Sequence, residues 1–493
     1  MTSAEHHAAA FHWPFSEPIT WRQLPAAFYR DATPTPVASP TLLVWNAPLA
    51  DQLALPLGGI PKAVRAAWFA GNDLPDACRP LAQAYAGHQF GGFTRLGDGR
   101  AHLLAEHVTP DGQRVDIQLK GSGRTPFSRG GDGRAALGPM LREFIISEAM
   151  AHLGIPTSRS LAVVATGESV YRERPLPGAV LTRIAASHLR IGTFEHAAHL
   201  GDPEQVSELL DYAIARHDPD LPEHAHPARA FLERVAERQI RLVALWMGVG
   251  FIHGVMNTDN TFISGETLDY GPCAFLDEYV PNKVFSSIDR HGRYGFSNQK
   301  AIILWNLARL AETLLPLLDP DPQAALQWAR NALKRWDQAM HEAWLARMRA
   351  KLGLEGEEAG DEDLIGTLLD WMHRYEADYT LTFRALAEDT AEQLPQASHP
   401  PVRDWITRWR ERLAAGGPVL PERFEAMQRL NPVRIPRNHQ VERVLAAAEA
   451  GDLKPLGQFL DALQAPFTRK PEWAEWDAPP APEARVLRTF CGT

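Results

Sequence analysis

Three residues suited to metal and phosphate chemistry lie in the stretch FIHGVMNTDNTFISGETLDYG, residues 251–271. They are His253, Asn260 seven places later, and Asp269, which is followed by tyrosine and glycine. Amide and carboxylate oxygens are ligands that Mg²⁺ prefers, and Mg²⁺ often takes only one or two because phosphates and waters complete its shell. We therefore expect Asn260 and Asp269 to hold Mg²⁺, on two strands joined by a turn at 264–267. A turn rich in Asp and Asn, without any ligand, is the alternative.

The spacing of these residues is that of the metal-binding half of a protein-kinase active site. A kinase carries a catalytic aspartate two residues after the histidine, where this chain has Val255. Valine can neither orient nor deprotonate an attacking hydroxyl group. Asp259 is the nearby carboxylate suited to be the base, although supporting a metal ligand or capping a turn are alternatives. His253 is expected to orient the loop through hydrogen bonds.

An ion pair is expected between Lys120 and Glu143. Lys120 ends the strand-like run QRVDIQLK, and Glu143 lies in the helical run PMLREFIISEAMAHLG, which also offers Glu148. In a kinase-like sheet, a lysine at this place points into the nucleotide cleft and pairs with a glutamate of the following helix. A lysine at a strand end can also extend its ammonium group into solvent. The metal-binding pattern later in the chain favours the ion pair.

Arginines are frequent around the glycine-rich segments GGFTRLGDGR and GSGRTPFSRGGDGRAALGP. Arg100 ends the first segment, Arg183 lies in the strand-like run AVLTRIA, and Arg190 follows where the two halves of the chain should meet. An arginine in an apolar strand is costly to bury without an anionic partner, and guanidinium groups bind phosphate oxygens in a bidentate manner. So many cations fit binding of a whole triphosphate, and attack at the α-phosphorus rather than the γ-phosphorus.

The composition of the 493-residue chain is that of a globular protein, with 45% hydrophobic and 22% charged residues. Its net charge of −10 argues against nucleic acid as a main partner. Three cysteines do not make a disulfide framework, so a reducing compartment is expected. The first residues lack the features of a secretory signal, and the apolar run LVALWMGVGFIHGVM is too short to span a bilayer. We expect a cytoplasmic protein without a membrane segment.

The elements that must position these residues divide the chain into unlike parts. Residues 1–80 are proline-rich and predict an irregular N-terminal extension with one or two helical turns, whereas residues 81–187 predict strands around one long helix. Apolar residues at three- and four-residue spacing predict helices in the remaining part, 188–493, at 229–251, 298–318, 321–352 and 361–390. The expected fold class is α+β, a two-lobed kinase-like fold. Its N-lobe is β-rich with one long helix, and its C-lobe is mainly helical with additional C-terminal helices.

The sequence resembles the selenoprotein O family, whose members have a pseudokinase-like fold. The matching segments cover most of the chain from about residue 80 onward. They include GHQFGGFTRLGDGRA, the strand ending in Lys120, GDGRAALGPMLREFIISEAM, the strand with Arg183, HGVMNTDN, LDYGPCAFLDEY and NPVRIPRNH. The resemblance implies transfer of AMP from ATP to Ser, Thr or Tyr hydroxyls of proteins, with the nucleotide reversed relative to a kinase.

The resemblance also implies a role for each matching residue. Asp259 would accept the proton, Asn260 and Asp269 would hold magnesium, and Glu143 would pair with Lys120. The residues implied to bind ATP are Gly97, Gly99, Arg100, Lys120, Asp132, Gly133, Arg183, Arg190 and Asp269. A reversed nucleotide turns its γ-phosphate inward, which leaves the kinase base without a role and explains the valine in its place.

Two cysteines gain a meaning from the same resemblance. Cys491 lies third from the C-terminus, in TFCGT, where animal members of the family carry selenocysteine, and Cys273 follows the metal-binding segment. The expectation is that the tail folds back and links the two in a redox-dependent disulfide. Two unlinked thiols are the alternative. Cys78 is expected to be structural.

Two other classes of function stay open beside protein adenylyl transfer. A non-catalytic nucleotide-binding scaffold would have no need to keep Lys120, Asn260 and Asp269 together. A small-molecule phosphotransferase would carry an aspartate at the position of Val255. We therefore favour a transferase with ATP as substrate, Mg²⁺ as metal and protein hydroxyls as acceptors. UTP with Mn²⁺ is a further combination that the sequence leaves open.

Overall fold

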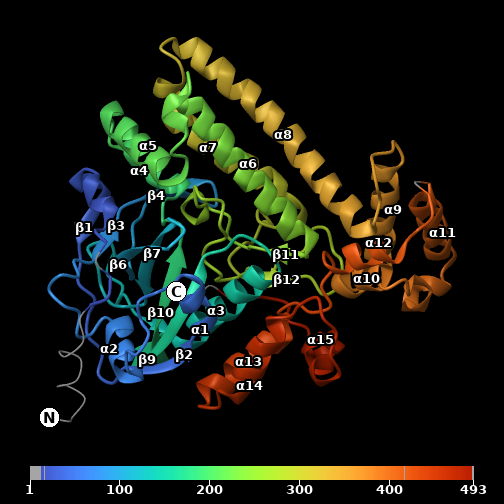
Figure 1. Ribbon diagram of the computed structural model, residues 1–493, viewed down its shortest axis with the longest axis horizontal. Helices are drawn as coiled ribbons and strands as arrows, with labels where there is room; N and C mark the ends of the chain where they lie inside the picture. Colours follow the sequence, from blue (N-terminus) through green and yellow to red (C-terminus); the bar gives the residue numbers. More distant parts are fainter. Residues whose placement is uncertain (1–12, 16, 416, 491–493) are drawn as a thin grey trace.

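The computed structural model describes residues 13–15, 17–415 and 417–490. Its architecture is mixed α and β: a β-rich N-terminal part is followed by a mainly helical C-terminal part (Figure 1). The residues suited to chemistry come from both parts. The elements between them bring these residues together.

An antiparallel sheet forms the centre of the N-terminal part, with its strands in the order β1-β3-β6-β7-β10-β9-β2 and with β8 paired to β10. The strands are β1 Tyr29–Asp31, β2 Thr41–Trp45, β3 Leu81–Gln83, β6 Ala101–Val108, β7 Arg114–Lys120, β8 Ala135–Ala136, β9 Arg159–Tyr171 and β10 Pro175–Ala185. Successive side chains of a strand point to opposite faces. In β7, Ile117 and Leu119 enter an apolar cluster on one face, so Gln118 and Lys120 lie on the other, toward the site.

The N-terminal segment is more regular than its proline content predicts. β2 pairs with β9 at the edge of the sheet, and α1 (Ala47–Gln52) and α2 (Lys62–Ala70) follow it. Trp68 and Phe69 of α2 are buried in the same apolar cluster as the side chains of β7. Burial of these large side chains stabilises the segment against the sheet, and residues up to 80 supply strands β1 and β2 rather than an irregular extension.

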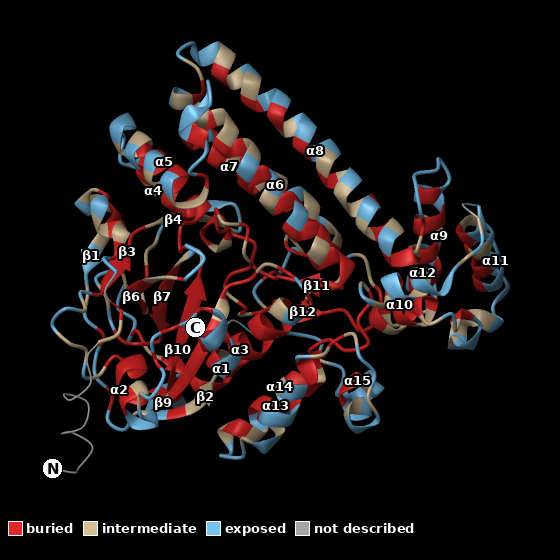
Figure 2. Ribbon diagram, viewed as in Figure 1, coloured by how far each residue is buried: buried red, intermediate tan, exposed pale blue. Residues whose placement is uncertain are grey.

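The long helix α3, Leu137–His152, packs against β9 and β10 on the face of the sheet that turns toward the C-terminal part. Nearly the whole helix is buried, including Glu143 (Figure 2). A helix that is buried on all sides requires neighbours on all sides. α13, Asn438–Glu449, packs against it from the C-terminal part.

Helices dominate the C-terminal part, and α6, α7 and α8 pack against one another as its largest unit. The helices not yet named are α4 Ile191–His199, α5 Pro203–His217, α6 Pro227–Gly248, α7 Gln299–Leu318, α8 Pro322–Leu352, α9 Asp361–Arg374, α10 Tyr379–Ala387, α11 Pro400–Ala414, α12 Pro421–Gln428, α14 Lys454–Leu463 and α15 Ala474–Asp477. The helical run expected at 361–390 is two helices, because Glu376 takes a left-handed φ of +48° and Asp378 caps the start of α10.

Two short ladders lie outside the main sheet. β4 (Ala86–Gln89) and β5 (Gly92–Arg95) form a hairpin, and β11 (Phe251–Ile252) pairs with β12 (Ala274–Phe275). The hairpin turns at Phe90 and Gly91, which both have positive φ, as a two-residue turn between antiparallel strands requires. The hairpin packs against α4 and not on the main sheet.

The stretch Phe296–Leu318, which contains α7, is long and apolar enough to cross a membrane by length and composition. Half of its most apolar window is buried inside the fold. Asn306, within this helix, donates hydrogen bonds to the Met256 carbonyl (3.1 Å) and to Thr261 Oγ1 (3.0 Å). The core helix of a globular fold gives the same signal, so this one stretch is weak support for a membrane segment.

Candidate active site

Four charged side chains from different elements meet at the end of β7. Lys120 Nζ lies 2.8 Å from Glu143 Oε2 and 2.7 Å from Asp269 Oδ1. Arg183, on the neighbouring strand β10, donates from Nε to Glu143 Oε1, and its Nη2 lies 3.3 Å from Asp269 Oδ1. The ion pair expected between Lys120 and Glu143 is therefore present, and the structure adds Arg183 to it. Two cations and two carboxylates alternate in one group, in which Lys120, Glu143 and Arg183 are buried and Asp269 is partly exposed.

The cations decide the protonation state of both acids. Burial acts to raise the pKa values of Glu143 and Asp269, but the charges of Arg183 and Lys120 outweigh it and hold both pKa values below their ordinary range. Burial acts to lower the pKa of Arg183, and the two carboxylates raise it above its ordinary value. Asp269 therefore stays ionised at neutral pH, as a metal ligand must be.

The segment that carries Asn260 is not the pair of strands that the sequence predicts. Asn260 ends a short 3₁₀ turn, and the strand-like contacts found for residues 261–269 in the described chain are isolated bridges to other segments. Phe262 forms such a bridge with Arg190, and Thr267 forms one with Thr157. Each flank pairs with a different neighbour, and within the described residues no ladder joins the two flanks to each other.

The side-chain oxygens of Asn260 and Asp269 are of the kind that Mg²⁺ binds. Asn260 uses its side-chain nitrogen to donate to the Val255 carbonyl at 3.0 Å, which leaves the amide oxygen for a ligand. Asp269 is held at a φ of +66°, an uncommon conformation for a residue with a side chain, and such positions concentrate at functional sites. The described residues contain no cluster of three or more His, Cys, Asp or Glu that fits a metal. Two hard oxygens with room for phosphates suit Mg²⁺.

His253 holds this loop in place through both of its ring nitrogens. Its Nε2 donates to the Leu268 carbonyl at 2.7 Å, so that Nδ1 accepts from the Val255 backbone nitrogen at 3.3 Å. Complete burial lowers its pKa below the ordinary value, which keeps the ring neutral. Both ring nitrogens are engaged, so His253 orients the loop and has no free nitrogen for proton transfer.

Asp259 is buried in a tight niche formed by three elements. Its Oδ2 accepts from Gln89 Nε2 at 3.3 Å, whereas Oδ1 has no hydrogen-bond partner in the described part of the chain. A Cβ atom on Gly87 would overlap with the carboxylate, and one on Gly192 would lie 3.2 Å from its Cα. Burial raises the pKa of Asp259 to about 6. A carboxylate with a pKa near the working pH and an unsatisfied oxygen is suited to accept a proton.

Arg190 lies at the start of α4 and is almost fully buried. Its guanidinium stacks over the ring of Tyr85 at 4.0 Å, and Nη1 lies 3.4 Å from Asp98 Oδ1. Its Nε is buried without a hydrogen-bond partner among the described residues. A buried donor without a partner is costly unless a ligand satisfies it. Arg190 and Arg183 approach the site from different elements, and Asp98 is a contact that the sequence did not reveal.

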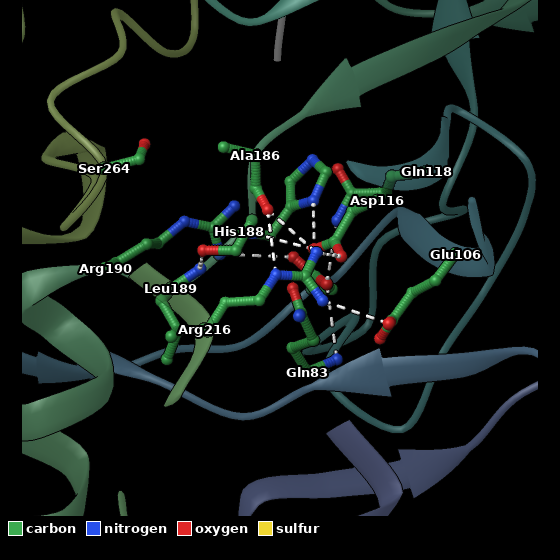
Figure 3. A network of polar contacts seen from close by, with 12 residues as sticks. Gln83, Glu106, Asp116, Gln118, Ala186, His188, Leu189, Arg190, Arg216 and Ser264 are labelled. Carbon is green, nitrogen blue, oxygen red and sulfur yellow. Dashed lines mark hydrogen bonds and ion pairs between the residues drawn. The ribbon is translucent and has the colours of Figure 1, made fainter. Parts of the chain in front are cut away.

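A buried polar network fixes the segment between β10 and Arg190 (Figure 3). Arg216 of α5 reaches into it, with Nη1 3.0 Å from Glu106 Oε2 and Nη2 2.6 Å from Asp116 Oδ1. Arg216 also donates to the Ala186 carbonyl, and the backbone nitrogen of His188 donates to Asp116 Oδ2 at 2.8 Å. The segment that leads from β10 to α4 is thereby tied to strands β6 and β7.

The two glycine-rich segments pack against each other. Gly97 has a φ of +136°, and a Cβ atom there would lie 2.5 Å from the Phe127 ring. Ser128 Oγ donates to the Gly99 carbonyl at 2.6 Å, which joins the segments directly. Arg100 lies at the end of the first segment and lines the same cavity as Lys120.

Asp132 and Gly133 lie in the second glycine-rich segment, toward its outer edge. Asp132 is exposed and pairs with Arg172 (2.8 Å), and this interaction lowers its pKa below the ordinary value. Gly133 has a φ of +70° and accepts from Gly123 N at 3.0 Å, so a side chain there would overlap with the backbone. Within the described residues, Asp132 contacts the Arg172 side chain and the Arg134 backbone nitrogen and not the buried group at Lys120.

A cavity of about 370 Å³ opens beside the charged group. Its walls come from the sheet, α3, the Asp-Tyr-Gly segment, α13 and residues near the C-terminus. The lining includes Arg100, Lys120, Glu143, Asp269, Glu442 and Phe490.

Arg142, next to Glu143, donates to the carbonyls of Gly271 (3.2 Å) and Cys273 (2.6 Å) and so anchors α3 to the metal-binding segment. Apart from the position of Arg142 next to Glu143, nothing in the sequence indicates these contacts.

The redox prediction is tested only in part. Cys273 is buried and forms no disulfide within the described residues, and burial raises the pKa of its thiol to about 12. Cys491 lies outside the described residues. The tail before it is docked near Cys273, because Thr489 Oγ1 donates to the Pro272 carbonyl at 2.5 Å and Thr489 N donates to the Phe285 carbonyl at 2.8 Å. The disulfide stays a prediction.

The site geometry defines a class of protein. Buried cations around a carboxylate, beside a cavity, are typical of enzymes that use a nucleoside triphosphate with a divalent metal. A family model described as "Protein adenylyltransferase SelO" matches residues 15–464. The chain belongs to this family.

Known relatives support this assignment over the full length of the chain. A protein of Geobacillus kaustophilus named "Protein nucleotidyltransferase YdiU" is 54% identical over 482 residues, which cover 98% of this chain and 99% of the relative. A protein of Nitrosococcus oceani with the same name is 52% identical over 493 residues, covering 100% of this chain and 99% of the relative.

Proposed function

We propose that this protein transfers AMP from ATP to hydroxyl groups of proteins. The observation that carries the proposal is the convergence of Lys120 and Arg183 on Asp269 in a chain that belongs to a family of protein adenylyltransferases. These cations can neutralise phosphate oxygens, and Asp269 with Asn260 can hold the metal that such a substrate brings. Mg²⁺ is the metal that their oxygens suit best.

The proposed reaction is a displacement at the α-phosphorus. The acceptor oxygen forms a bond to that phosphorus, the bond from it to the bridging oxygen breaks, and pyrophosphate leaves. Asp259 takes the proton of the hydroxyl group, for which its raised pKa and its unpartnered oxygen are suited. The bound metal would lower the charge of the phosphates. Lys120 and Arg183 would bind phosphate oxygens and hold the nucleotide in place.

We further propose that the two parts of the chain are the lobes of a kinase-like fold that binds ATP in reverse. The order of β-rich and helical parts, the Lys120–Glu143 pair and the segment from His253 to Asp269 support this. Val255 at the place of a kinase base also supports it, since a γ-phosphate turned inward would not meet an acceptor there. The Nε of Arg190, buried without a partner, is suited to bind an inward phosphate.

The acceptors proposed are Ser, Thr and Tyr hydroxyl groups, because each can lose a proton to a carboxylate during attack. A location in the cytoplasm, with no membrane or nucleic-acid partner, is proposed from the net charge of −10 and the few cysteines.

ATP labelled on either the α- or the γ-phosphate tests the function. We expect the protein fraction to retain α-label and not γ-label when Mg²⁺ is present. Retention of γ-label would mean phosphorylation, and retention of neither would favour a nucleotide-binding scaffold. Lys120→Met is the matched control that should lose the α-label.

A further inference from the structure

The β4–β5 hairpin, residues 86–95, is fixed directly above the Asp259 niche. Three consecutive hairpin residues each donate a hydrogen bond to one of three consecutive residues, 257–259. The bonds run from His88 N to Thr258 Oγ1 (2.7 Å), from Gln89 Nε2 to Asp259 Oδ2 (3.3 Å) and from Phe90 N to Asn257 Oδ1 (3.2 Å). The hairpin tip therefore has a set position relative to Asp259.

The tip of this hairpin presents two aromatic side chains to solvent. Phe90 is 40% exposed and Phe93 is 41% exposed, which is unusual for side chains of this size. Phe90 also has a φ of +52°, a conformation that is strained for a bulky residue. Its backbone is held by Asn257, and its ring lies 5.1 Å from that of Tyr294. A strained, exposed aromatic residue beside a candidate catalytic carboxylate indicates a binding role.

Two arginines without ion-pair partners among the described residues lie at the hairpin: Arg293 beside its turn and Arg95 at its other end, opposite Ala86. Arg95, at the end of β5, is exposed, and neither it nor Arg293 forms an ion pair within the described residues. The Arg293 guanidinium stacks over the Trp305 ring at 4.8 Å, close to the turn at Gly91. Its Nε is buried with no hydrogen-bond partner in the part of the chain that the structure describes. Arg293 and Arg95 are thus positive charges at the hairpin without an ion pair among the described residues, on a protein with a net charge of −10.

We propose that the β4–β5 hairpin is the docking platform for the protein substrate. An extended polypeptide segment packs against Phe90 and Phe93 and places its hydroxyl group at Asp259, with acidic side chains beside the hydroxyl facing Arg293 and Arg95. This inference rests on the proposed function, because it assigns the site at which the acceptor of that reaction binds.

The aromatic and arginine side chains of the hairpin and its surroundings favour an acidic polypeptide segment as the ligand. Exposed aromatic and arginine side chains contribute most of the binding energy at protein interfaces, because they bury large areas with few rotatable bonds. Charge complementarity with Arg293 and Arg95 favours an acidic segment. Gln89 joins the tip to Asp259 through its hydrogen bond, so a segment docked on the tip would lie next to the residue that contacts the carboxylate. Gln89 is a positioning residue, since it acts through Asp259.

The test compares two unfolded acceptor proteins, dephosphorylated casein, which is acidic, and myelin basic protein. Transfer of α-label to each is measured over a range of acceptor concentrations, and ATP affinity is measured separately by calorimetry. The variants are Phe93→Ala, Arg293→Glu and Phe90→Asn; asparagine tolerates the left-handed φ of residue 90, so the turn is kept. Leu420→Ala removes an apolar side chain that is even more exposed (60%), at the start of α12, and is the matched control.

We expect the wild-type protein to favour casein, and kcat/KM for casein to fall by about tenfold in Phe93→Ala and Phe90→Asn. ATP affinity and the melting temperature should stay as in the wild type, and Leu420→Ala should behave as the wild type. Arg293→Glu should remove the preference for casein, and Arg293→Lys should restore part of it. Unchanged transfer in the hairpin variants, a preference for the basic protein, or equal losses of ATP affinity would overturn the docking site. Absence of α-label on every acceptor would instead reject the proposed function.

Discussion

Lys120 Nζ lies 2.7 Å from Asp269 Oδ1, so a cation of the sheet contacts the candidate metal ligand of the helical part directly. Arg183 contacts the same oxygen, and Glu143 contacts both cations. The two parts of the chain are therefore joined at the site by charge. A bound metal and triphosphate would compete for these same groups, so the group is arranged to exchange its internal ion pairs for ligand contacts.

Lys120→Met tests whether this lysine serves ATP or only the fold. Glu143 keeps Arg183 as partner in this variant, so its charge is not left alone. We expect AMP transfer to fall by at least about 100-fold, with a weaker binding of ATP in calorimetry. The melting temperature should change little. Full transfer activity with normal ATP affinity would contradict a role for Lys120 in phosphate binding.

Asp259→Asn should reduce AMP transfer by about 100-fold or more while leaving ATP affinity unchanged, because the variant keeps the size of the side chain and loses the base. The pKa of Asp259 is raised to about 6 from an ordinary value of 3.8. Wild-type transfer, measured with α-labelled ATP, should rise with pH up to about 6 and then level off. A flat profile between pH 5 and 7 would argue for another proton acceptor.

The same substitution should make the protein more stable. Because the pKa is raised in the folded state, that state binds more protons than the unfolded chain between pH 3.8 and about 6, so stability falls as pH rises through this window. At pH 7 the buried charge therefore lowers the free energy of unfolding, by at most about 3 kcal/mol. Urea unfolding of Asp259→Asn at pH 7 and pH 4 should show a gain only at pH 7.

Gly87→Ala should disturb Asp259 without touching the nucleotide. A Cβ atom at this position overlaps with the Asp259 carboxylate, and displacement of a catalytic group by about 1 Å lowers rates by about 100-fold. ATP affinity should be retained. Gly366→Ala is the control, because a Cβ atom there, in α9, meets nothing within 4 Å. If Gly87→Ala and Gly366→Ala were equally active, the close packing of residue 87 against the Asp259 carboxylate would not be needed for transfer.

Removal of the metal should abolish transfer, and Asn260→Ala should raise the Mg²⁺ concentration needed for half-maximal transfer. Asn260 Nδ2 also donates to the Val255 carbonyl, so the loop is expected to loosen slightly. Titration with MgCl₂ after treatment with EDTA measures the shift. An unchanged magnesium requirement in Asn260→Ala would remove this residue from the metal site.

Arg216→Ala should destabilise the protein strongly, because it leaves Glu106 and Asp116 buried with fewer counter-charges. Breaking a buried ion pair by removing one partner costs about 3–5 kcal/mol. Arg234→Ala removes an arginine from an exposed pair with Asp220 and should cost less than about 1 kcal/mol. Urea unfolding measures both, and similar losses would mean that the buried network is not critical.

Much of the site was predictable because local sequence carries it. The alternation in QRVDIQLK placed Lys120 at the end of β7, and the helical run after it placed Glu143 on α3. The two strands expected around the turn at 264–267 were wrong, because Phe262 and Thr267 pair with different distant segments. Strands β1 and β2 were not predicted from the sequence, because proline-rich segments show weak periodicity and because β2 is fixed by its partner β9.

The sequence by itself determined which chemical groups are present and their order along the chain: the metal-binding segment, the lysine and glutamate, and the arginines near glycine. The tertiary structure decided which of them touch. Gln89 and Asp259 are 170 positions apart, and Arg216 and Asp116 are 100 apart. Periodicity records only neighbours within one element, whereas a contact between distant elements depends on how whole faces pack. For this reason the aromatic hairpin above Asp259 became visible only in the folded chain.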